Sequence, residues 1–235
     1  MLKIEGLVKK YGSKVAVKNL SLEIKAGEIC GFIGHNGAGK TTAIKAVCGI
    51  HKFDKGEITV GGHSIKSEPL MCKEMIAYIP DQPNLYEFLT GIKYLNFVAD
   101  VFKVEGSVRD GYIQKYADLF ELTRDLANPI SSYSHGMKQK LAIISALLHE
   151  PKLLVLDEPF VGLDPVASRA VKDIMRDMCD KGAAVFFSTH ILEVAEKLCD
   201  NIAVINNGNL VAFGKTEHVK GDKSLESAFF EKIES

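Results

Sequence analysis

The stretch Gly34–Thr41 limits the folds open to this chain more than any other part of its sequence. It reads Gly-His-Asn-Gly-Ala-Gly-Lys-Thr and lies between the apolar run Glu28–Ile33 and a segment of helical composition, Thr41–Cys48. Glycines let successive backbone N–H groups turn toward an anion, and the N-terminus of the following helix adds its dipole. This spacing between a strand and a helix therefore predicts a phosphate-binding loop in an α/β fold.

Two side chains of this loop have expected roles of their own. Lys40 is the cation that reaches the terminal phosphates, and the Thr41 hydroxyl is placed to ligate Mg²⁺. Backbone N–H groups supply the remaining contacts. The full set of expected ligand contacts is Gly34, His35, Asn36, Gly37, Ala38, Gly39, Lys40, Thr41 and Thr42.

A second candidate site follows the wholly apolar run Leu153–Leu156, which is typical of a strand buried in a parallel sheet. Asp157 and Glu158 end that strand. Asp157 is positioned to hold Mg²⁺ through water, and Glu158 to polarise an attacking water. Adjacent acids at a strand end can also cap a helix or lie in a solvated turn. The phosphate-binding loop in the same chain favours the catalytic interpretation.

Hydrophobic periodicity outlines the rest of the fold. Strict alternation over Leu20–Lys25 predicts a half-buried antiparallel strand near the N-terminus. From Gly91 to Leu122 the pattern becomes helical, which predicts a helical insert before the chain returns to the α/β core. The apolar face expected within this insert consists of Val108, Tyr112, Tyr116 and Leu119.

Composition and charge exclude several other classes of protein. The chain has 29 basic and 30 acidic residues, so no overall charge attracts it to nucleic acid or anionic lipid. Its longest nearly apolar stretch, Leu141–Leu148, is far shorter than the roughly 20 residues of a membrane span. The N-terminus lacks the apolar core of a signal peptide. The 5 cysteines form no CxxC pair, so we expect reduced packing residues in a cytosolic protein.

Three further motifs follow the glycine-rich loop along the chain. Tyr133-Ser134-His135-Gly136-Met137 opens an amphipathic helix, Gly162-Leu163-Asp164 follows the two carboxylates, and His190 ends a Ser-Thr-His run. Together with the loop and the carboxylates, these motifs stand in the order typical of the ATP-binding cassette subunit of ABC transporters. The chain resembles that family over nearly its full length. Its YSHGM sequence resembles the exporter-like drug and peptide subfamily of ABC-2 type.

The resemblance assigns catalytic and metal-binding roles to the matching positions. The loop corresponds to the Walker A motif, and the strand ending in Asp157 corresponds to Walker B. The resemblance implies that Lys40, Glu158 and His190 are catalytic and that ATP and Mg²⁺ are the cofactors. It also implies that Asp157 ligates Mg²⁺ beside Thr41.

Further nucleotide contacts are implied by the resemblance alone. Tyr11 stands where the family places an aromatic ring that stacks on adenine, although an isolated tyrosine there would be ordinary strand-end packing. Ser134 and Gly136 of the signature face a γ-phosphate, and Asp164 belongs to the D-loop. The signature of this chain reads YSHGM where LSGGQ is commonest in the family, but both of these contact residues are kept.

The segment that matches the Q-loop departs from the common pattern. Asp81 follows Pro80 where the family usually has Gln, and Gln82 comes one residue later. Carboxylate and amide oxygens both bind Mg²⁺. The sequence therefore leaves open whether Asp81 or Gln82 reaches the metal or the water.

The implied architecture is a single ABC ATPase domain over residues 1–235. Residues 1–80 and 150–215 would form a P-loop NTPase (RecA-like) core with an N-terminal antiparallel β-subdomain. Residues 81–149 would form the helical subdomain that bears the signature. Residues 216–235 would form a C-terminal tail with a docking helix, because apolar residues recur there at helical spacing.

The partners implied are a second ATP-binding subunit and a separately encoded integral membrane permease, with no nucleic acid. Two subunits, as a homodimer or a heterodimer, would close head-to-tail around two MgATP and lie on the inner face of the membrane through the permease. We expect the permease to dock on the segment from Asp81 to about Phe102, which concentrates apolar and aromatic side chains in a loop. These side chains are Pro83, Leu85, Tyr86, Phe88 and Leu89.

A different class of function is a soluble ABC ATPase that acts on nucleic acid or ribosomes. DNA-repair relatives insert a long coiled coil before the signature, but the interval from Lys40 to Ser134 contains no heptad repeats. Translation-factor relatives carry two cassettes in one chain, and this sequence contains one. Both features favour the transporter interpretation.

Overall fold

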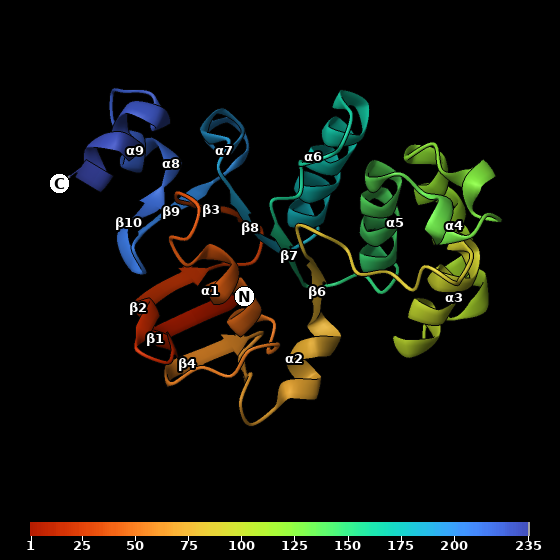
Figure 1. The fold of residues 1–235 in the computed structure, drawn as a ribbon, viewed down its shortest axis with the longest axis horizontal. Helices are drawn as coiled ribbons and strands as arrows, with labels where there is room; N and C mark the ends of the chain where they lie inside the picture. Colours follow the sequence, from red (N-terminus) through yellow and green to blue (C-terminus); the bar gives the residue numbers. More distant parts are fainter. Residues whose placement is uncertain (235) are drawn as a thin grey trace. The chain divides into compact units, whose positions relative to one another are not determined.

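The protein, described here from a computed structural model over residues 1–234, folds into two compact units (Figure 1). Unit 1 contains Met1–Tyr78, Lys152–Pro159 and the chain from Met175 onward. Unit 2 contains Ile79–Pro151 and Phe160–Ile174.

Unit 1 begins with a four-stranded antiparallel sheet in the order β2-β1-β4-β5 (Figure 1). Its strands are β1 (Leu2–Tyr11), β2 (Lys14–Ile24), β4 (Lys55–Val60) and β5 (His63–Ser64). In β1, Ile4 pairs with Leu22 of β2 and with Ile58 of β4. Inward and outward side chains alternate along these strands, which confirms the predicted half-buried antiparallel sheet.

A six-stranded sheet in the order β10-β9-β3-β8-β7-β6 follows. Its strands are β3 (Ile29–Ile33), β6 (Ile76–Ile79), β7 (Leu153–Asp157), β8 (Ala184–Thr189), β9 (Asn201–Asn206) and β10 (Asn209–Lys215). Strands β9, β3, β8 and β7 run parallel, so their carboxyl ends lie along one edge. Every residue of β3, β7 and β8 is buried, as expected for strands covered on both faces.

The helices of unit 1 are α1 (Lys40–Val47), α2 (Pro69–Met75), α7 (Leu192–Leu198), α8 (Thr216–Lys220) and α9 (Leu225–Glu234). One hydrophobic core joins both sheets and α1, and includes the tilted ring pair Phe32–Phe186, with centroids 5.3 Å apart. Helix α9 lies against α7, α8 and β10 and buries Leu225 and Phe229. The apolar side of the C-terminal helix therefore packs on its own unit.

Unit 2 is helical. Its helices are α3 (Gly91–Val101), α4 (Gly106–Leu119) and α5 (His135–Leu147), with 3₁₀ turns at Thr123–Asp125 and Ile130–Ser132. Helix α6 (Pro165–Asp180) begins in unit 2 and ends in unit 1. Helices α3, α4 and α5 pack on one another. A flat stack of Phe102 on His149, with centroids 3.7 Å apart, adds to this packing.

The sequence prediction for the apolar face of α4 is wrong. Val108 and Leu119 are exposed, whereas the helix buries Ile113 and Ala117. The predicted face contains two tyrosines, whose hydroxyls favour partial exposure. The buried face consists of Ile113 and Ala117. Alanine is small and only weakly apolar, so this face adds little to the hydrophobic periodicity of the sequence.

Residues Phe160–Ile174 belong to unit 2, whereas the sequence analysis placed all of residues 150–215 in the core. The reason lies in two contacts with α5. Asp164 pairs with Lys140, with 2.9 Å between Oδ2 and Nζ. Gly162 lies so close to His135 that an added Cβ would be 2.4 Å from the imidazole Cδ2.

Candidate active site

The glycine-rich loop joins β3 to α1, and its backbone leaves no space for side chains at two positions. At Gly39, where φ is +112°, an added Cβ would lie 2.5 Å from the carbonyl oxygen of Ala16. At Gly34 an added Cβ would lie 2.4 Å from the carbonyl oxygen of Ile205. These close approaches are why the loop requires glycine there.

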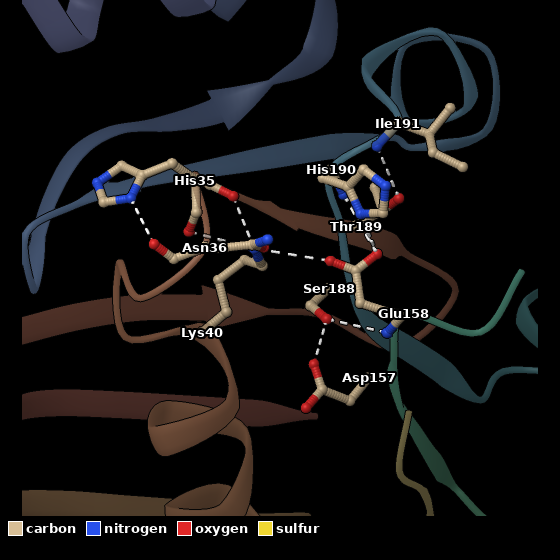
Figure 2. Close-up of polar contacts among 10 residues, drawn as sticks. His35, Asn36, Lys40, Asp157, Glu158, Ser188, Thr189, His190 and Ile191 are labelled. Carbon is tan, nitrogen blue, oxygen red and sulfur yellow. Dashed lines mark hydrogen bonds and ion pairs between the residues drawn. The ribbon is translucent and has the colours of Figure 1, made fainter. Parts of the chain in front are cut away.

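Lys40 is the first residue of α1, and only 7% of its side chain is exposed. Its ammonium donates to the carbonyl of Gly34 at 2.6 Å and lies 3.6 Å from Oε1 of Glu158 (Figure 2). A buried cation needs such partners, because its transfer out of water is costly. The chain thus fixes a positive charge inside the loop.

The N-terminus of α1 has no side-chain cap and no acidic residue in its first turn. Its first backbone N–H groups therefore have no intrahelical acceptor, and the helix dipole adds positive potential there. The outer part of the loop is held by His35, whose Nδ1 lies 2.8 Å from the carbonyl oxygen of Asn36 and whose Nε2 lies 3.1 Å from Oδ1 of Asn206. The arrangement is suited to a phosphate anion.

Asp157 ends β7 with only 1% of its side chain exposed. The hydroxyl of Ser188, on the neighbouring strand β8, donates to Oδ1 (Figure 2). Within residues 1–234, Oδ2 is buried and has no hydrogen-bond partner. A buried carboxylate oxygen without a donor has the right chemistry for a cation or a metal-bound water.

Glu158 follows at the carboxyl end of β7 with a left-handed backbone, φ +51°. Its N–H donates to the carbonyl and hydroxyl oxygens of Ser188 at 3.2 and 3.0 Å, which holds this unfavourable conformation. Its Oε1 faces Lys40, and its Oε2 lies 2.9 Å from Nδ1 of His190 (Figure 2). The carboxylate therefore stands between two groups that the sequence analysis selected separately.

Unit 1 brings together Lys40, Asp157, Glu158 and His190 from α1, β7 and the end of β8 (Figure 2). Thr41 and Thr42 belong to the first turn of α1. In the described part of the chain, no three His, Cys, Asp or Glu side chains form a group suited to a metal. Asp157 and the Thr41 hydroxyl nevertheless fit Mg²⁺, which is commonly held by one or two carboxylates, waters and substrate phosphates.

Ser188 is a site residue to which the sequence analysis gave no role. It is completely buried and bonds to both Asp157 and Glu158. The available signal was a serine at the end of the apolar strand β8, where a polar side chain needs a buried partner. Its pairing across two strands required the sheet order, which the sequence does not provide.

In unit 2, Ser134 is the N-cap of α5, and its Oγ accepts the backbone N–H of Met137 at 3.2 Å. This bond uses an oxygen lone pair and leaves the hydroxyl proton free to donate to an anion. Tyr133 anchors the turn, because its ring is buried and its hydroxyl donates to the carbonyl of Asp125 at 2.6 Å.

The other expected contacts of unit 2 lie beside or beyond this turn. At Gly136 an added Cβ would lie 2.8 Å from the carbonyl oxygen of Gly162, so the two motifs are packed backbone to backbone. The backbone N–H of Ala167 and the ammonium of Lys140 hold the pKa of Asp164 below its ordinary value. Asp81 and Gln82 are both exposed, and the Gln82 N–H donates to Oδ1 of Asp81 at 2.9 Å.

Two sequence expectations concern the chain as a whole. All 5 cysteines, Cys30, Cys48, Cys72, Cys179 and Cys199, are free and buried, which confirms the packing role. Burial is the main reason that the pKa of Cys179 is raised to about 11. None of the helices within residues 1–234 is long and apolar enough to span a bilayer.

Comparisons with known proteins agree with this geometry. Residues 17–161 match the family described as ABC transporter. The chain is 38% identical over 213 residues to the uncharacterized ABC transporter ATP-binding protein YdbJ of Bacillus subtilis (strain 168), covering 90% of this chain and 68% of YdbJ. It is 36% identical over 217 residues to the linearmycin resistance ATP-binding protein LnrL of the same organism, covering 91% and 69%.

A solved structure described as the ATP binding subunit of an ABC transporter superposes with a TM-score of 0.95 at 33% identity, covering 99% of both chains. The predicted ABC ATPase fold is therefore confirmed. The chain belongs to the ABC transporter family and is an ATP-binding cassette ATPase domain.

Proposed function

We propose that this chain binds ATP with Mg²⁺ and hydrolyses it to drive transport through a separate membrane permease. The observation that carries the proposal is the placement of Glu158 between Lys40 and His190, at 3.6 and 2.9 Å. Attack of water on a terminal phosphate requires a general base close to a phosphate-binding cation. The Glu158 carboxylate is such a base, and it contacts both the Lys40 ammonium and the polar ring of His190.

In the proposed reaction, the glycine-rich loop and Lys40 hold the terminal phosphates of ATP. Glu158 accepts a proton from water as the oxygen adds to the γ-phosphorus, and the bond to ADP breaks. His190 orients the Glu158 carboxylate and donates toward the γ-phosphate. Asp157 and Thr41 would hold Mg²⁺, which would neutralise charge on the phosphate oxygens. A role for Asp81 or Gln82 at the metal stays a prediction from the sequence.

Glu158→Gln tests the assignment. The amide keeps the shape of the side chain but cannot take a proton from water, so turnover should fall by about 10²- to 10⁴-fold while ATP affinity is kept. Glu28→Gln, at an acidic residue that precedes β3, is the matched control and should retain the turnover of the unaltered chain. Phosphate release measures turnover, and calorimetry measures affinity. Unchanged turnover in Glu158→Gln would contradict the role of Glu158.

The proposed working form is a head-to-tail dimer, homomeric or heteromeric, around two nucleotides. The free hydroxyl proton of Ser134 and the N–H groups at the start of α5 would contact the γ-phosphate bound by the partner's loop. We place Asp164 in the same contact. ATP bound without hydrolysis would stabilise this dimer, because it is bound by both surfaces.

The proposed permease contact is the segment from Asp81 to about Phe102. Phe88 is 82% exposed, and Tyr86 is about half exposed and packs edge-on against Phe97, with centroids 5.6 Å apart. An aromatic cluster of this kind on a surface is typical of a protein interface. The subunit would then be peripheral on the inner membrane face. Export as the direction is supported by the similarity to LnrL, which is named for linearmycin resistance.

Phe88→Glu tests this contact. The substitution should spare the ATPase activity of the isolated subunit but release the subunit from its permease during purification from detergent extracts. Val108→Glu, at an exposed apolar residue outside this segment, is the control and should leave the subunit bound to the permease. Copurification of Phe88→Glu with the permease at full yield would place the contact elsewhere. Copurification with nucleic acid or ribosomes would support the soluble alternative, which the net charge of −1 does not favour.

A further inference from the structure

Tyr11 ends β1 with its ring 46% exposed, and two neighbours fix how that ring stands. Its hydroxyl lies 2.8 Å from Nδ1 of His51, and the two rings meet edge to face at 79°, with centroids 6.2 Å apart. The ammonium of Lys9 lies over the Tyr11 ring, 4.8 Å from its centroid. The ring is thus tethered at its tip and covered by a cation on one face.

The loop that carries His51 is hydrogen-bonded to α1 and to β1, the two elements that the nucleotide would contact. Its backbone N–H donates to the carbonyl of Lys45 at 3.1 Å, so it is fixed to the last turn of α1, the helix that begins with Lys40. Three residues later, the N–H of Asp54 donates to the carbonyl of Val8 on β1 at 2.8 Å. The His51 loop therefore connects the phosphate-binding helix to the strand that carries Tyr11.

We propose that His51 is a positioning residue for the nucleobase, because it holds the Tyr11 ring in the orientation that stacks on adenine. The inference rests on the proposed function, in which Tyr11 receives the base. The base takes the ring face opposite Lys9. A tethered ring loses less side-chain freedom when the base arrives than a free one does, so part of the ordering cost is met before binding.

The charges around His51 are consistent with a neutral ring. Burial, followed by Lys45 and Lys9, lowers the pKa of His51 from its ordinary value. A neutral imidazole can bond to a phenol in either tautomer, because the phenol oxygen is both donor and acceptor. The tether to Tyr11 therefore does not depend on which ring nitrogen carries the proton.

The test compares two ligands that share phosphates but differ in the base. ADP and pyrophosphate, each with Mg²⁺, are titrated calorimetrically into the full chain, since neither is hydrolysed at the γ-position. His51→Ala should weaken ADP about two- to tenfold and leave pyrophosphate unchanged, because only ADP uses Tyr11. Tyr11→Phe, which keeps the ring but loses the tether, should show a loss of the same size.

The double variant Tyr11→Phe with His51→Ala should bind ADP no more weakly than either single variant, because both remove one shared contact. His63→Ala is the matched control, since His63 bonds to Glu68 instead. His51→Ala that leaves ADP affinity unchanged, or weakens pyrophosphate equally, would overturn the inference, and so would additive losses in the double variant. Failure of the unaltered chain to bind ADP would instead count against the proposed function.

Discussion

The glycine-rich loop of unit 1 and the signature turn of unit 2 are both built to meet phosphate, but they differ in how their polar groups are partnered. In the loop, the Lys40 ammonium already bonds to Gly34 and faces Glu158, and the side chain is buried. At the signature turn, Ser134 is exposed and uses only its oxygen in the helix cap. One region has its charges arranged within the fold, and the other presents unused donors on a surface.

This difference suggests that unit 1 binds and reacts with the nucleotide, whereas the signature turn of unit 2 acts only when a partner is present. A buried, preorganised charge acts strongly on a bound anion because water does not screen it. Exposed helix-end donors act weakly by themselves and gain strength when a second surface excludes water. We therefore expect substitutions in the loop to abolish nucleotide binding. Substitutions at the signature turn should abolish only dimerisation around the nucleotide.

The largest expected effect belongs to Lys40→Ala. It removes the buried cation of the loop, so MgATP affinity should fall by 100-fold or more, which corresponds to about 2.7 kcal/mol. Lys45→Ala, on the last turn of the same helix, is the control and should bind normally. Both affinities are measured by calorimetry. Equal affinities for the two variants would contradict the role of Lys40 as the buried phosphate-binding cation.

The next effect concerns assembly. In the Glu158→Gln background ATP should produce dimers on size exclusion, and adding Ser134→Arg should prevent them while ATP still binds the loop. The arginine would fill the place where the partner's phosphate docks. Ser131→Arg, at an exposed position three residues earlier, should leave the dimers intact. Loss of ATP binding in the Ser134→Arg variant would show that the two regions are not separable in this way.

The sequence predicted the site residues whose roles depend on local backbone geometry or on their place at a strand end. It did not predict the residues whose roles depend on contacts between distant segments. The loop was predictable because glycine at Gly34 and Gly39 is a requirement of local geometry, and Asp157 and Glu158 were predictable as polar groups that end an apolar run. The roles of Ser188 and His51 were not predictable, since each acts on a residue brought beside it by strand pairing or a loop contact.

The same reasoning applies to the fold. Alternating strands and apolar parallel strands were recognised because the sheet imposes its period on the sequence. The face of α4 was predicted wrongly because its burial rests on Ile113 and Ala117, too few apolar groups to outweigh nearby aromatic residues. The grouping of Phe160–Ile174 with unit 2 was not predicted because the contacts of Asp164 with Lys140 and of Gly162 with His135 leave no local sequence pattern.

Ser188→Ala tests how the buried site of unit 1 depends on its internal hydrogen bonds. It removes the donor to Oδ1 of the buried Asp157 carboxylate and leaves that oxygen unpaired, whereas the Glu158 N–H keeps its bond to the Ser188 carbonyl. We expect a loss of about 1–3 kcal/mol in the free energy of unfolding, measured by urea denaturation, together with lower turnover. Ser67→Ala, at an exposed serine of unit 1, is the control. Unchanged stability and unchanged turnover would contradict the role of Ser188 in holding Asp157 and Glu158.

The smallest effect tests the contact beneath the signature turn. Gly162 and Gly182 both have positive φ, +80° and +91°, but an added Cβ at Gly162 would meet the ring of His135, whereas one at Gly182 would meet nothing within 4 Å. Alanine at either position costs about 1–2 kcal/mol of backbone strain. Gly162→Ala should cost up to about 1 kcal/mol more, because the exposed imidazole has to move aside. In a His135→Gly background, with His135→Gly alone as the reference, Gly162→Ala should cost only the strain common to both sites. If the excess persists in the double variant, the backbone of Gly136, and not the His135 ring, is what Gly162 accommodates.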